Sequence, residues 1–447
     1  MAADMLRTMN DRDEIVGIVG LGYVGLPLAV AFVESGLEVV GLDANLERVA
    51  QLKSGSSPID DVPDERLRTA LAGRLTIDAP SADHVRRCDV LFVCVPTPID
   101  RAKNPDLRAI RESAAEIAEG LRKGHLVVLQ STTYPGTTTG PFREELERSG
   151  LRADVDFDLA YAPERINPGD PRTASKAVPR LVGGNTAAAT SRAAALLERI
   201  SEQVVQLSSP DAAELAKLLE NIYRNVNIAL VNQLALLCER MGVDVWEVID
   251  AASTKPFGFM RFTPGPGVGG HCIPVDPYYL AWRAREFDFV DRFVETAGDV
   301  NMAMPRHVVD LCVAALNDRG KSLRGATVGV IGVAFKPNIS DARNSPAAAI
   351  LALLADRGAE VVYHDPHVPT FVDDHRQSRG SVPLEQCLES DLVVILNGHA
   401  AVDWQLVFDR AALIVDTVNQ SKGKEIADGQ VLRLGAGWGP QMAASRA

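Results

Sequence analysis

The chain has 447 residues, of which 46% are hydrophobic and 23% are charged, as is typical of a soluble globular protein. At about 150 residues per domain, this length predicts two or three domains. The net charge of −13 argues against nucleic acid or an anionic membrane as a partner, because both bind positive surface. No segment approaches the ~18 apolar residues of a membrane span, and the first residues lack the apolar region of a signal peptide. We therefore expect a cytoplasmic protein that does not bind membranes.

The first elements that the sequence predicts are a strand, a glycine turn, a helix and a second strand, over residues 14–43. The turn GLGYVG at residues 20–25 matches G-x-G-x-x-G, and an aspartate ends the second strand eighteen residues later. Such glycines let backbone N–H groups approach a pyrophosphate at a helix N-terminus, while the aspartate accepts ribose hydroxyls and repels a 2′-phosphate. The pattern predicts NAD rather than NADP, with a purely structural turn as the weaker alternative. The expected NAD contacts are Gly20, Gly22, Tyr23, Val24, Gly25 and Asp43.

Further buried strands are predicted at residues 89–96, 125–132 and 157–164, with a helix around 110–121. This alternation predicts a mainly parallel sheet. The segments VPTP and STT follow two of these strands directly, and Glu164 follows the third. Because the carboxyl ends of parallel strands line the ligand crevice, we expect Thr97, Thr132 and Glu164 near the site. Each could also be an ordinary turn or surface residue.

The middle of the chain, from about 209 to 318, contains no convincing strand. One helix is predicted from the region of Pro210, capped by Ser209 or Asp211, to Gly242. Apolar residues occupy much of its circumference, so we expect it to be largely buried, as an interdomain spine or a dimer seam. A polar stripe of Lys217, Asn221 and Asn225 runs along one of its faces.

Six cysteines are spread singly, which indicates neither a disulfide framework nor a zinc site. Five lie in apolar or helical surroundings and are expected to be buried. Cys272 instead lies in GPGVGGHCIPVDPYYL, a glycine- and proline-rich loop at residues 265–280. The adjacent His271 and the later Asp276 make a poor metal site, so we expect no metal and interpret His271 as a residue that shapes the loop.

Towards the C-terminus, a strand at 327–336, a helix and a strand at 359–365 repeat the first pattern. We therefore expect an α/β protein in which two Rossmann-like parallel-sheet domains are joined by a central all-helical segment with one long helix. The expected bounds are 1–208, 209–318 and 319–447. The second copy lacks the glycine fingerprint, so no second dinucleotide is expected. Lys336 follows its first strand and could meet a diphosphate as a point charge.

The reactive cysteine indicates a particular kind of oxidation. Converting a primary alcohol to a carboxylate removes two hydrides, and the intermediate aldehyde is a poor hydride donor until a nucleophile adds to it. A thiolate can add, giving a thiohemiacetal that becomes a thioester. Cys272 meets this requirement, because a glycine-rich loop can present amide groups that activate a thiol.

Together, the motifs GIVGLGYVGLP, VPTP, STTYPGT, APER, GPGVGGHCIPVDP and GVAFKPNISDARNSPA resemble the UDP-glucose/GDP-mannose dehydrogenase family over nearly the whole chain. The resemblance implies an NAD-binding Rossmann domain, a central helical dimerisation segment that makes a homodimer, and a C-terminal domain that holds the nucleotide of a nucleotide-sugar substrate. It implies Cys272 as covalent nucleophile, with Lys217 and Asn221 at the reacting oxygen. Asp276 would assist water and proton transfer, and Thr132 and Glu164 would position water, substrate and nicotinamide.

The resemblance also implies which residues contact each ligand. Cofactor contacts would include Arg48, Thr97, Thr132 and Arg343. Substrate contacts would include Glu164, Arg165, Lys217, Asn221, Arg261, Gly265, Gly269 and Lys336. Simpler interpretations stay open for three of the implied site residues: a solvated Lys217, a turn cap at Asp276 and a surface charge at Glu164.

The substrate is indicated by Val275, which stands where the glucose and GDP-mannose branches of the family typically have lysine. The loop looks more like the branch acting on UDP-N-acetylhexosamines. The implied function is four-electron oxidation of the C6 hydroxyl of UDP-N-acetylglucosamine or UDP-N-acetylmannosamine to the uronic acid. Alternatives are a UDP- or TDP-glucose 6-dehydrogenase, a single-oxidation hydroxy-acid dehydrogenase of related architecture, and a non-catalytic nucleotide-binding protein.

Overall fold

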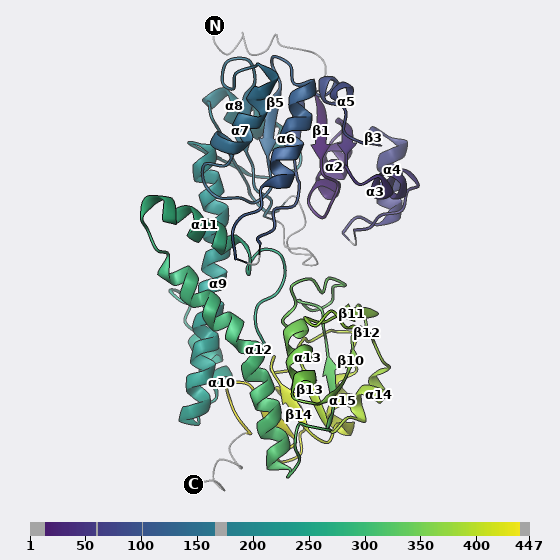
Figure 1. Cartoon of the computed structure of the whole chain (residues 1–447), viewed down its shortest axis with the longest axis vertical. Coiled ribbons are helices and arrows are strands. Elements are labelled where there is room, and N and C mark those ends of the chain that lie inside the picture. The colour runs from purple at the N-terminus through teal and green to yellow at the C-terminus, as the bar shows by residue number, and fades with distance from the viewer. Residues whose placement is uncertain (1–13, 60, 101, 166–176, 439–447) are drawn as a thin grey trace. The chain divides into compact units, whose positions relative to one another are not determined.

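The structure, a computed structural model, describes residues 14–59, 61–100, 102–165 and 177–438. The chain divides into two compact units (Figure 1). Unit 1 consists of Met1–Glu220 with Tyr278–Phe289, and unit 2 consists of Asn221–Pro277 with Val290–Ala447. The boundary falls within one long helix, so each unit contains part of it.

Unit 1 is built on an eight-stranded sheet in the order β3-β2-β1-β4-β5-β6-β7-β8. All its pairs are parallel except β6 with β7. Val19 pairs with both Leu42 and Val93, so neighbouring strands end level and their following loops share one edge. The strands are β1 (Ile15–Val19), β2 (Glu38–Leu42), β3 (Leu75–Asp78), β4 (Val90–Val93), β5 (Leu126–Leu129), β6 (Asp158–Tyr161), β7 (Arg180–Gly184) and β8 (Val204–Leu207).

The central strands of this sheet are buried along their whole length, as expected where helices cover both faces. Phe32 of the first helix stacks against Phe92 of β4, with ring centroids 5.3 Å apart. The α-helices of unit 1 up to residue 197 are α2 (Gly25–Glu34), α3 (Leu46–Lys53), α4 (Asp64–Ala72), α5 (Ala82–Arg87), α6 (Arg108–Gly120), α7 (Arg143–Leu146) and α8 (Ala187–Leu197). A π-helical turn (Thr138–Phe142) and a 3₁₀ turn (Glu147–Ser149) flank α7.

The predicted long helix is present as α9 (Pro210–Met241), and Ser209 Oγ accepts a hydrogen bond from Ala212 N–H at its start. It is followed by α10 (Val245–Ala252), α11 (Asp276–Ala284), a 3₁₀ turn (Arg285–Phe287) and α12 (Arg292–Asp318). Residues 209–318, all of which are described, contain no strand.

The expectation that α9 is largely buried is wrong for the single chain. Leu219 is 62% exposed and Leu230 is 60% exposed. The other large apolar residues exposed on α9 are Leu215, Tyr223, Leu237 and Met241. Positions 215, 219, 223, 230, 237 and 241 recur every four or seven residues and therefore form one stripe. The opposite side carries buried residues such as Leu218 and Ala235.

Unit 2 contains a five-stranded parallel sheet in the order β10-β9-β13-β14-β15. As in unit 1, the first strand lies between the second strand and a later one, which confirms the predicted repeat of the Rossmann pattern. Its strands are β9 (Thr327–Ile331), β10 (Glu360–His364), β13 (Leu392–Ile395), β14 (Ile414–Asp416) and β15 (Val431–Arg433), with a hairpin of β11 (Thr370–Val372) and β12 (Ser378–Gly380). Its helices after α12 are α13 (Pro346–Asp356), α14 (Leu384–Leu388) and α15 (Trp404–Arg410).

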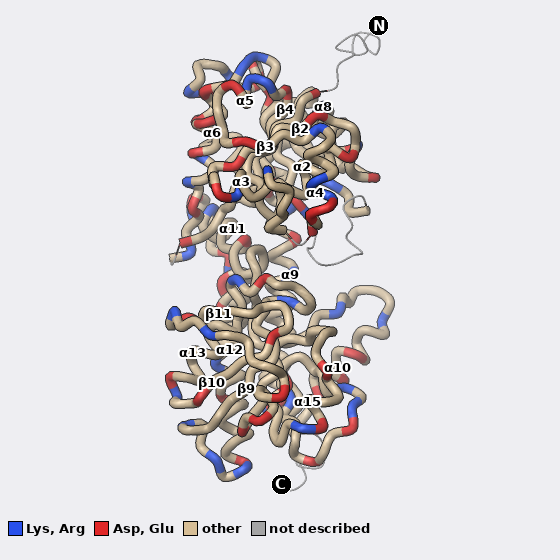
Figure 2. The backbone as a smooth tube through the Cα atoms, turned by 90° about the vertical axis from the view of Figure 1, so that its right-hand side faces the viewer, with Lys and Arg blue, Asp and Glu red and all other residues tan. Residues whose placement is uncertain are grey.

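Basic and acidic residues are interspersed along both units (Figure 2). In the part of the chain that the structure describes, no helix has the length and apolarity needed to cross a lipid bilayer.

Candidate functional site

The glycine loop between β1 and α2 in unit 1 has the geometry of a dinucleotide site. Gly20 has φ of +90°, and a Cβ there would lie 2.7 Å from the carbonyl oxygen of Cys94. A Cβ at Gly25 would lie 1.8 Å from the carbonyl oxygen of Gly20, so the helix could not pack as it does. A Cβ at Gly22 would meet only Arg48, at 3.9 Å. The first and third glycines thus allow the turn and the packing, and the second leaves the backbone open to a ligand.

Asp43 lies at the end of β2 beside this loop. Its Oδ2 accepts a hydrogen bond from Leu21 N–H at 2.8 Å, and its Oδ1 accepts one from Asn45 N–H at 2.9 Å. Arg48 Nη1 lies 3.5 Å from Oδ2. Asp43 therefore braces the glycine loop while keeping acceptor capacity for a ribose. Tyr23 is 44% exposed, and Val24 immediately precedes α2.

The loops after β4, β5 and β6 meet the same edge of the sheet, as their register requires. Thr97 and Thr132 are half-buried in the first two loops. Glu164, in the third, accepts a hydrogen bond from Gln130 Nε2 at 3.2 Å and forms an ion pair with Arg180 at 3.1 Å. Glu164 is therefore fixed by side chains rather than solvated, which argues against the surface-charge interpretation.

Arg165 follows Glu164 but points to other partners. It donates to the carbonyl of Pro179 at 2.6 Å and pairs with Glu220 of α9 at 2.6 Å.

The polar stripe of α9 is buried: Lys217 is 7% exposed, Asn221 0% and Asn225 4%. Among the described residues, no hydrogen bond or ion pair holds the Lys217 ammonium. A buried ammonium without a partner is costly, so a ligand group would stabilise it. Asn221 Nδ2 donates to Asp276 Oδ2 at 2.5 Å, and Arg224 donates to Asn221 Oδ1. These contacts bring together two of the predicted site residues of unit 2.

Asn225 has a structural role instead. Its Oδ1 accepts a hydrogen bond from Asn301 of α12 at 2.8 Å, and Asn232 Nδ2 donates to Asn301 Oδ1 at 2.9 Å. Asn232 Oδ1 in turn accepts from Gly265 N–H at 3.0 Å. This series of amides ties α9 to α12 and to the start of the cysteine loop.

Cys272 is exposed, whereas the other five cysteines are buried, as predicted. Burial raises the pKa of Cys88, Cys312 and Cys387 to about 12, which keeps these thiols protonated and unreactive. The carbonyl of Cys272 accepts a hydrogen bond from Asp276 N–H at 2.8 Å, so the thiol lies one turn before the start of α11.

His271 Nε2 lies 2.9 Å from the Asp341 carboxylate, and the Arg343 side chain donates two hydrogen bonds to the same carboxylate, at 2.9 and 2.7 Å. Burial would raise the pKa of Asp341, but the hydrogen bonds from His271 and Arg343 outweigh it and hold that pKa well below its ordinary value. The cysteine loop is therefore anchored to the loop after β9. The cofactor role of Arg343 stays a prediction.

Two glycines of the cysteine loop are explained by packing. A Cβ at Gly269 would lie 2.8 Å from the Cβ of Phe335, and one at Gly270 would lie 2.9 Å from the Phe335 ring. Asn344 Nδ2 donates to the carbonyl of Gly270 at 3.1 Å. At Gly265, by contrast, a Cβ would meet no described residue within 4 Å.

Unit 2 contains a cavity of about 310 Å³ at the carboxyl ends of β9 and β13. Residues from five segments line it: the cysteine loop with Thr263 just before it, the loop after β9, the start of α13, the loop after β13 and the loop after β14. Lys336 lies half-buried in the second of these segments. Arg261 lies outside this group, exposed and paired with Asp250 at 2.8 Å.

Two polar residues were not predicted from sequence. Arg180, which pairs with Glu164, is the first residue of β7 and belongs to no recognisable sequence motif. Glu214, on α9 one turn before Lys217, is fully buried and accepts hydrogen bonds from Gly136 N–H at 2.7 Å and Thr138 N–H at 2.9 Å. Its spacing from Lys217 on the polar stripe is the signal that could have identified it.

Comparison with known protein families matches three segments of the chain. They are the NAD binding domain, the central domain and the UDP binding domain of the UDP-glucose/GDP-mannose dehydrogenase family, at residues 14–204, 211–303 and 329–422. The chain belongs to this family. A UDP-N-acetyl-D-glucosamine 6-dehydrogenase of Pseudomonas aeruginosa is 38% identical over 379 residues, which cover 83% of this chain and 87% of that protein.

Solved structures of family members share the fold. The UDP-D-ManNAc dehydrogenase of Pyrococcus horikoshii matches with a TM-score of 0.86 and 33% identity, over 95% of this chain and 99% of that one. A UDP-glucose dehydrogenase of Pyrobaculum islandicum matches with a TM-score of 0.82 and 29% identity, over 96% and 99%. The fold is thus common to members named for different sugars.

Membership in the UDP-glucose/GDP-mannose dehydrogenase family confirms the predicted enzyme class and cofactor: the protein is an oxidoreductase that uses NAD to oxidise a nucleotide sugar. The residues present fit NAD, since the glycine loop leaves an open approach at Gly22 and Asp43 stands beside it. Gly20, Gly22, Tyr23, Val24, Gly25 and Asp43 would hold the dinucleotide.

Proposed function

We propose that this protein oxidises the C6 hydroxyl of UDP-N-acetylglucosamine or UDP-N-acetylmannosamine to a carboxylate through a covalent intermediate on Cys272. The observation that carries the proposal is the exposed Cys272 thiol, one turn before an Asp276 that is hydrogen-bonded to Asn221. The UDP-N-acetylhexosamine relatives and the valine at position 275 support the choice of sugar.

NAD, when bound, accepts one hydride in each of the two oxidations. Between them, the Cys272 thiol adds to the aldehyde that the first oxidation leaves: Sγ bonds to the carbon, the C=O π bond opens and the thiol proton passes to the oxygen. The resulting thiohemiacetal loses the second hydride and a proton and becomes a thioester. Water then breaks the carbon–sulfur bond, which releases the carboxylic acid and restores the thiol. Without such a nucleophile the reaction would stop after one oxidation.

The buried polar groups of α9 suit the negative charge that develops on the C6 oxygen. Lys217 offers an ammonium that no residue of the described chain engages, and Asn221 offers an amide held in place by Asp276. In this proposal Asp276 handles the proton of the hydrolytic water, while Thr132 and Glu164 position water, substrate and nicotinamide.

For the nucleotide of the substrate, the cavity of unit 2 is the proposed site, with Lys336 meeting the diphosphate and Gly265 and Gly269 bordering the sugar. Arg165 and Arg261 are kept as proposed substrate contacts, and Arg48, Thr97 and Arg343 as proposed cofactor contacts. The functional segments that we propose are 1–208, 209–318 and 319–447. The start of α9 at Pro210 and the end of α12 at Asp318 support these bounds.

A homodimer through α9 is part of the proposal. The stripe of exposed apolar residues that includes Leu219 and Leu230 would be covered by the same stripe of a second copy. Sedimentation should give a dimer for the wild type, and Leu219→Asp combined with Leu230→Asp should shift it to monomer. A dimer that persists in this variant would contradict the α9 seam. All six cysteines lie within the described residues and none is in a disulfide there, which is compatible with the cytoplasm as compartment.

The decisive experiment measures NADH released per sugar acid formed, with UDP-N-acetylglucosamine, UDP-N-acetylmannosamine, UDP-glucose, TDP-glucose and GDP-mannose. We expect two NADH per acid with an N-acetylhexosamine. Cys272→Ala should abolish acid formation but keep NAD binding, whereas the control Cys238→Ala, which removes a buried thiol, should keep both. One NADH per turnover, or activity that survives Cys272→Ala, would favour a single-oxidation dehydrogenase. Binding of both ligands without NADH formation would favour a non-catalytic protein.

A further inference from the structure

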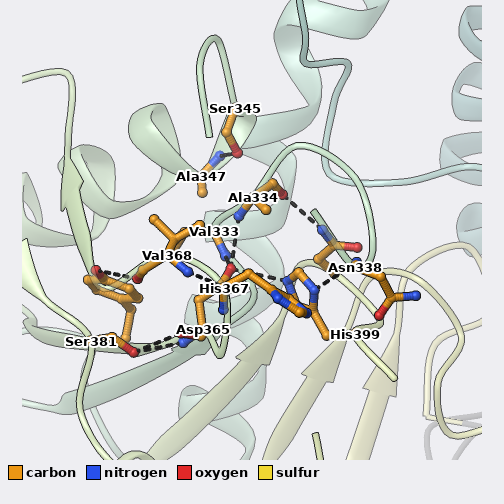
Figure 3. A network of polar contacts seen from close by, with 12 residues as sticks. Val333, Ala334, Asn338, Ser345, Ala347, Asp365, His367, Val368, Ser381 and His399 are labelled. Atoms are coloured by element: carbon orange, nitrogen blue, oxygen red, sulfur yellow. Dashed lines mark hydrogen bonds and ion pairs between the residues drawn. The ribbon is translucent and has the colours of Figure 1, made fainter. Parts of the chain in front are cut away.

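Asp365 lies at the end of β10, the place that Asp43 occupies at the end of β2, but its surroundings differ (Figure 3). It is only 3% exposed. Its Oδ2 accepts hydrogen bonds from Val333 N–H at 2.8 Å, Ala334 N–H at 3.0 Å and His399 Nε2–H at 3.1 Å. Its Oδ1 accepts from the N–H groups of residues 367 and 368, at 2.8 and 3.1 Å.

These five donors, counted over the described residues, use the acceptor capacity of an ionised carboxylate, which is about four lone-pair sites. Burial would raise the pKa of Asp365, but the hydrogen bonds from His399 and the backbone outweigh it and leave that pKa lowered. Asp43 accepts only two backbone N–H groups in the described chain. Asp365 therefore has no acceptor left for a ribose, so it must do something other than bind a ligand.

His399 is fully buried, and its hydrogen bonds indicate its tautomer. Asn338 N–H donates to Nδ1 at 3.0 Å, so Nδ1 carries no proton and the proton on Nε2 points at Asp365. The Asn338 side chain bonds to the residue after His399, because its Oδ1 accepts a hydrogen bond from Ala400 N–H at 2.7 Å. Nearby, Asn397 Nδ2 donates to the carbonyl of Ala334 at 2.9 Å.

Asp365 Oδ2, His399 and Asn397 all contact residues 332–338, which we call the clamp loop. Asp365 holds its beginning at residues 333 and 334, and His399 holds its end at Asn338 (Figure 3). Gly332, Ala334, Phe335 and Pro337 of this loop line the cavity of about 310 Å³, and Lys336 lies between the last two.

The clamp loop also supports the loop of Cys272. Gly269 and Gly270 pack so closely on Phe335 that a Cβ at either would come within 3 Å of that side chain. A displaced clamp loop would therefore disturb both the cavity and the glycine segment that precedes the nucleophile.

We propose that the buried His399–Asp365 pair is a positioning device that holds the clamp loop in the shape that the nucleotide of the substrate requires. The positioning role rests on the proposed function, in which the nucleotide of the substrate occupies the cavity of unit 2. Neither side chain lines the cavity. Both act through hydrogen bonds to the backbone of residues 333–338.

Two replacements separate the two hydrogen bonds of His399. His399→Asn keeps an acceptor near the Nδ1 position for Asn338 N–H but loses the donor to Asp365, and His399→Gln does the reverse. The matched control is His125→Asn, because His125 is also fully buried and its Nδ1 also accepts a backbone N–H, from Arg122 at 3.3 Å, but in unit 1. Asn338→Gly is a surface replacement that removes only the side-chain contact to Ala400 and tolerates the φ of +62° there.

The measurement is titration calorimetry of the full-length protein with UDP and, separately, with NAD, followed by KM values for the nucleotide sugar and for NAD. We expect both His399 variants to raise the Kd of UDP and the KM of the sugar about tenfold, and Asn338→Gly to raise them about threefold, with NAD constants unchanged. His125→Asn should lower the Tm but leave UDP binding as in the wild type.

Unchanged UDP affinity in a folded His399 variant, or equal loss of UDP and NAD affinity, would overturn the inference. If neither His399 variant folds, unchanged UDP affinity in Asn338→Gly overturns it instead. A wild type that binds no UDP would refute the proposed function, which is a separate outcome.

Discussion

Replacing Glu214 with glutamine tests how burial acts on a carboxyl group that the sequence did not single out. Burial raises the pKa of Glu214 from 4.5 to about 7, even though the hydrogen bonds from Thr138 and Gly136 act in the opposite direction. The folded protein therefore keeps a proton that the unfolded chain releases above pH 4.5. The stability that this group contributes is complete below pH 4.5 and is lost as the pH rises to about 7. At about 1.4 kcal/mol per pH unit, the loss between pH 5.5 and pH 7 is about 2 kcal/mol.

Glutamine cannot ionise, so Glu214→Gln removes this pH dependence. It also leaves at least one donor of the loop at residues 136–138 without an acceptor, which costs about 1–3 kcal/mol at every pH. Urea unfolding at pH 5.5 should therefore find the variant less stable than the wild type by about that amount. By pH 8.5 the difference in unfolding free energy between wild type and variant should have narrowed by about 2 kcal/mol.

A suitable control is Glu145→Gln, which removes a buried glutamate of the same unit that is paired with Arg111 at 3.1 Å and Arg148 at 2.6 Å. Its loss should destabilise the protein across the whole pH range. A gap between wild type and Glu214→Gln that stays constant from pH 5.5 to 8.5 would refute the reasoning, because it would mean that burial does not hold a proton on Glu214.

Two further replacements and one chemical labelling test other contacts of the structure. Gly25→Ala would place a Cβ 1.8 Å from the carbonyl oxygen of Gly20, so calorimetry should find NAD binding weakened at least tenfold; near-normal binding would contradict this packing. Asn301→Ala would remove the amide that bonds to both Asn225 and Asn232 of α9, and the free energy of unfolding of the variant should fall by about 1–3 kcal/mol; a change under about 0.5 kcal/mol would argue against the amide series. Iodoacetamide should label the native protein at Cys272 and the denatured protein at all six cysteines, as read by mass spectrometry; a second site labelled at the same rate would contradict the burial of the others.

The sequence predicted the fold best where short-range patterns decide it. The glycine turn, the buried strands and the long helix each depend on residues that are neighbours in the chain, such as those between Ile15 and Asp43. The nucleophile could be predicted for the same reason, because the surroundings of Cys272 are visible within ten residues.

Contacts between distant segments could not be predicted in this way. Glu214 meets Thr138 across 76 positions, and His399 meets Asp365 across 34. In both cases the residue types alone suggest a solvated side chain. The exposure of Leu219 and Leu230 was missed for another reason: an apolar helix pattern predicts that a surface is covered, but not whether the same chain covers it.

The contrast between Asp43 and Asp365 has a consequence for an enzyme that carries two copies of one nucleotide fold. Abundant dinucleotide would compete with the sugar nucleotide if both copies could accept an adenosine ribose. Saturation of Asp365 by its own backbone and by His399 removes the group that such a ribose would need. At the end of β10, unit 2 therefore lacks the free carboxylate acceptor that Asp43 keeps for a ribose at the end of β2.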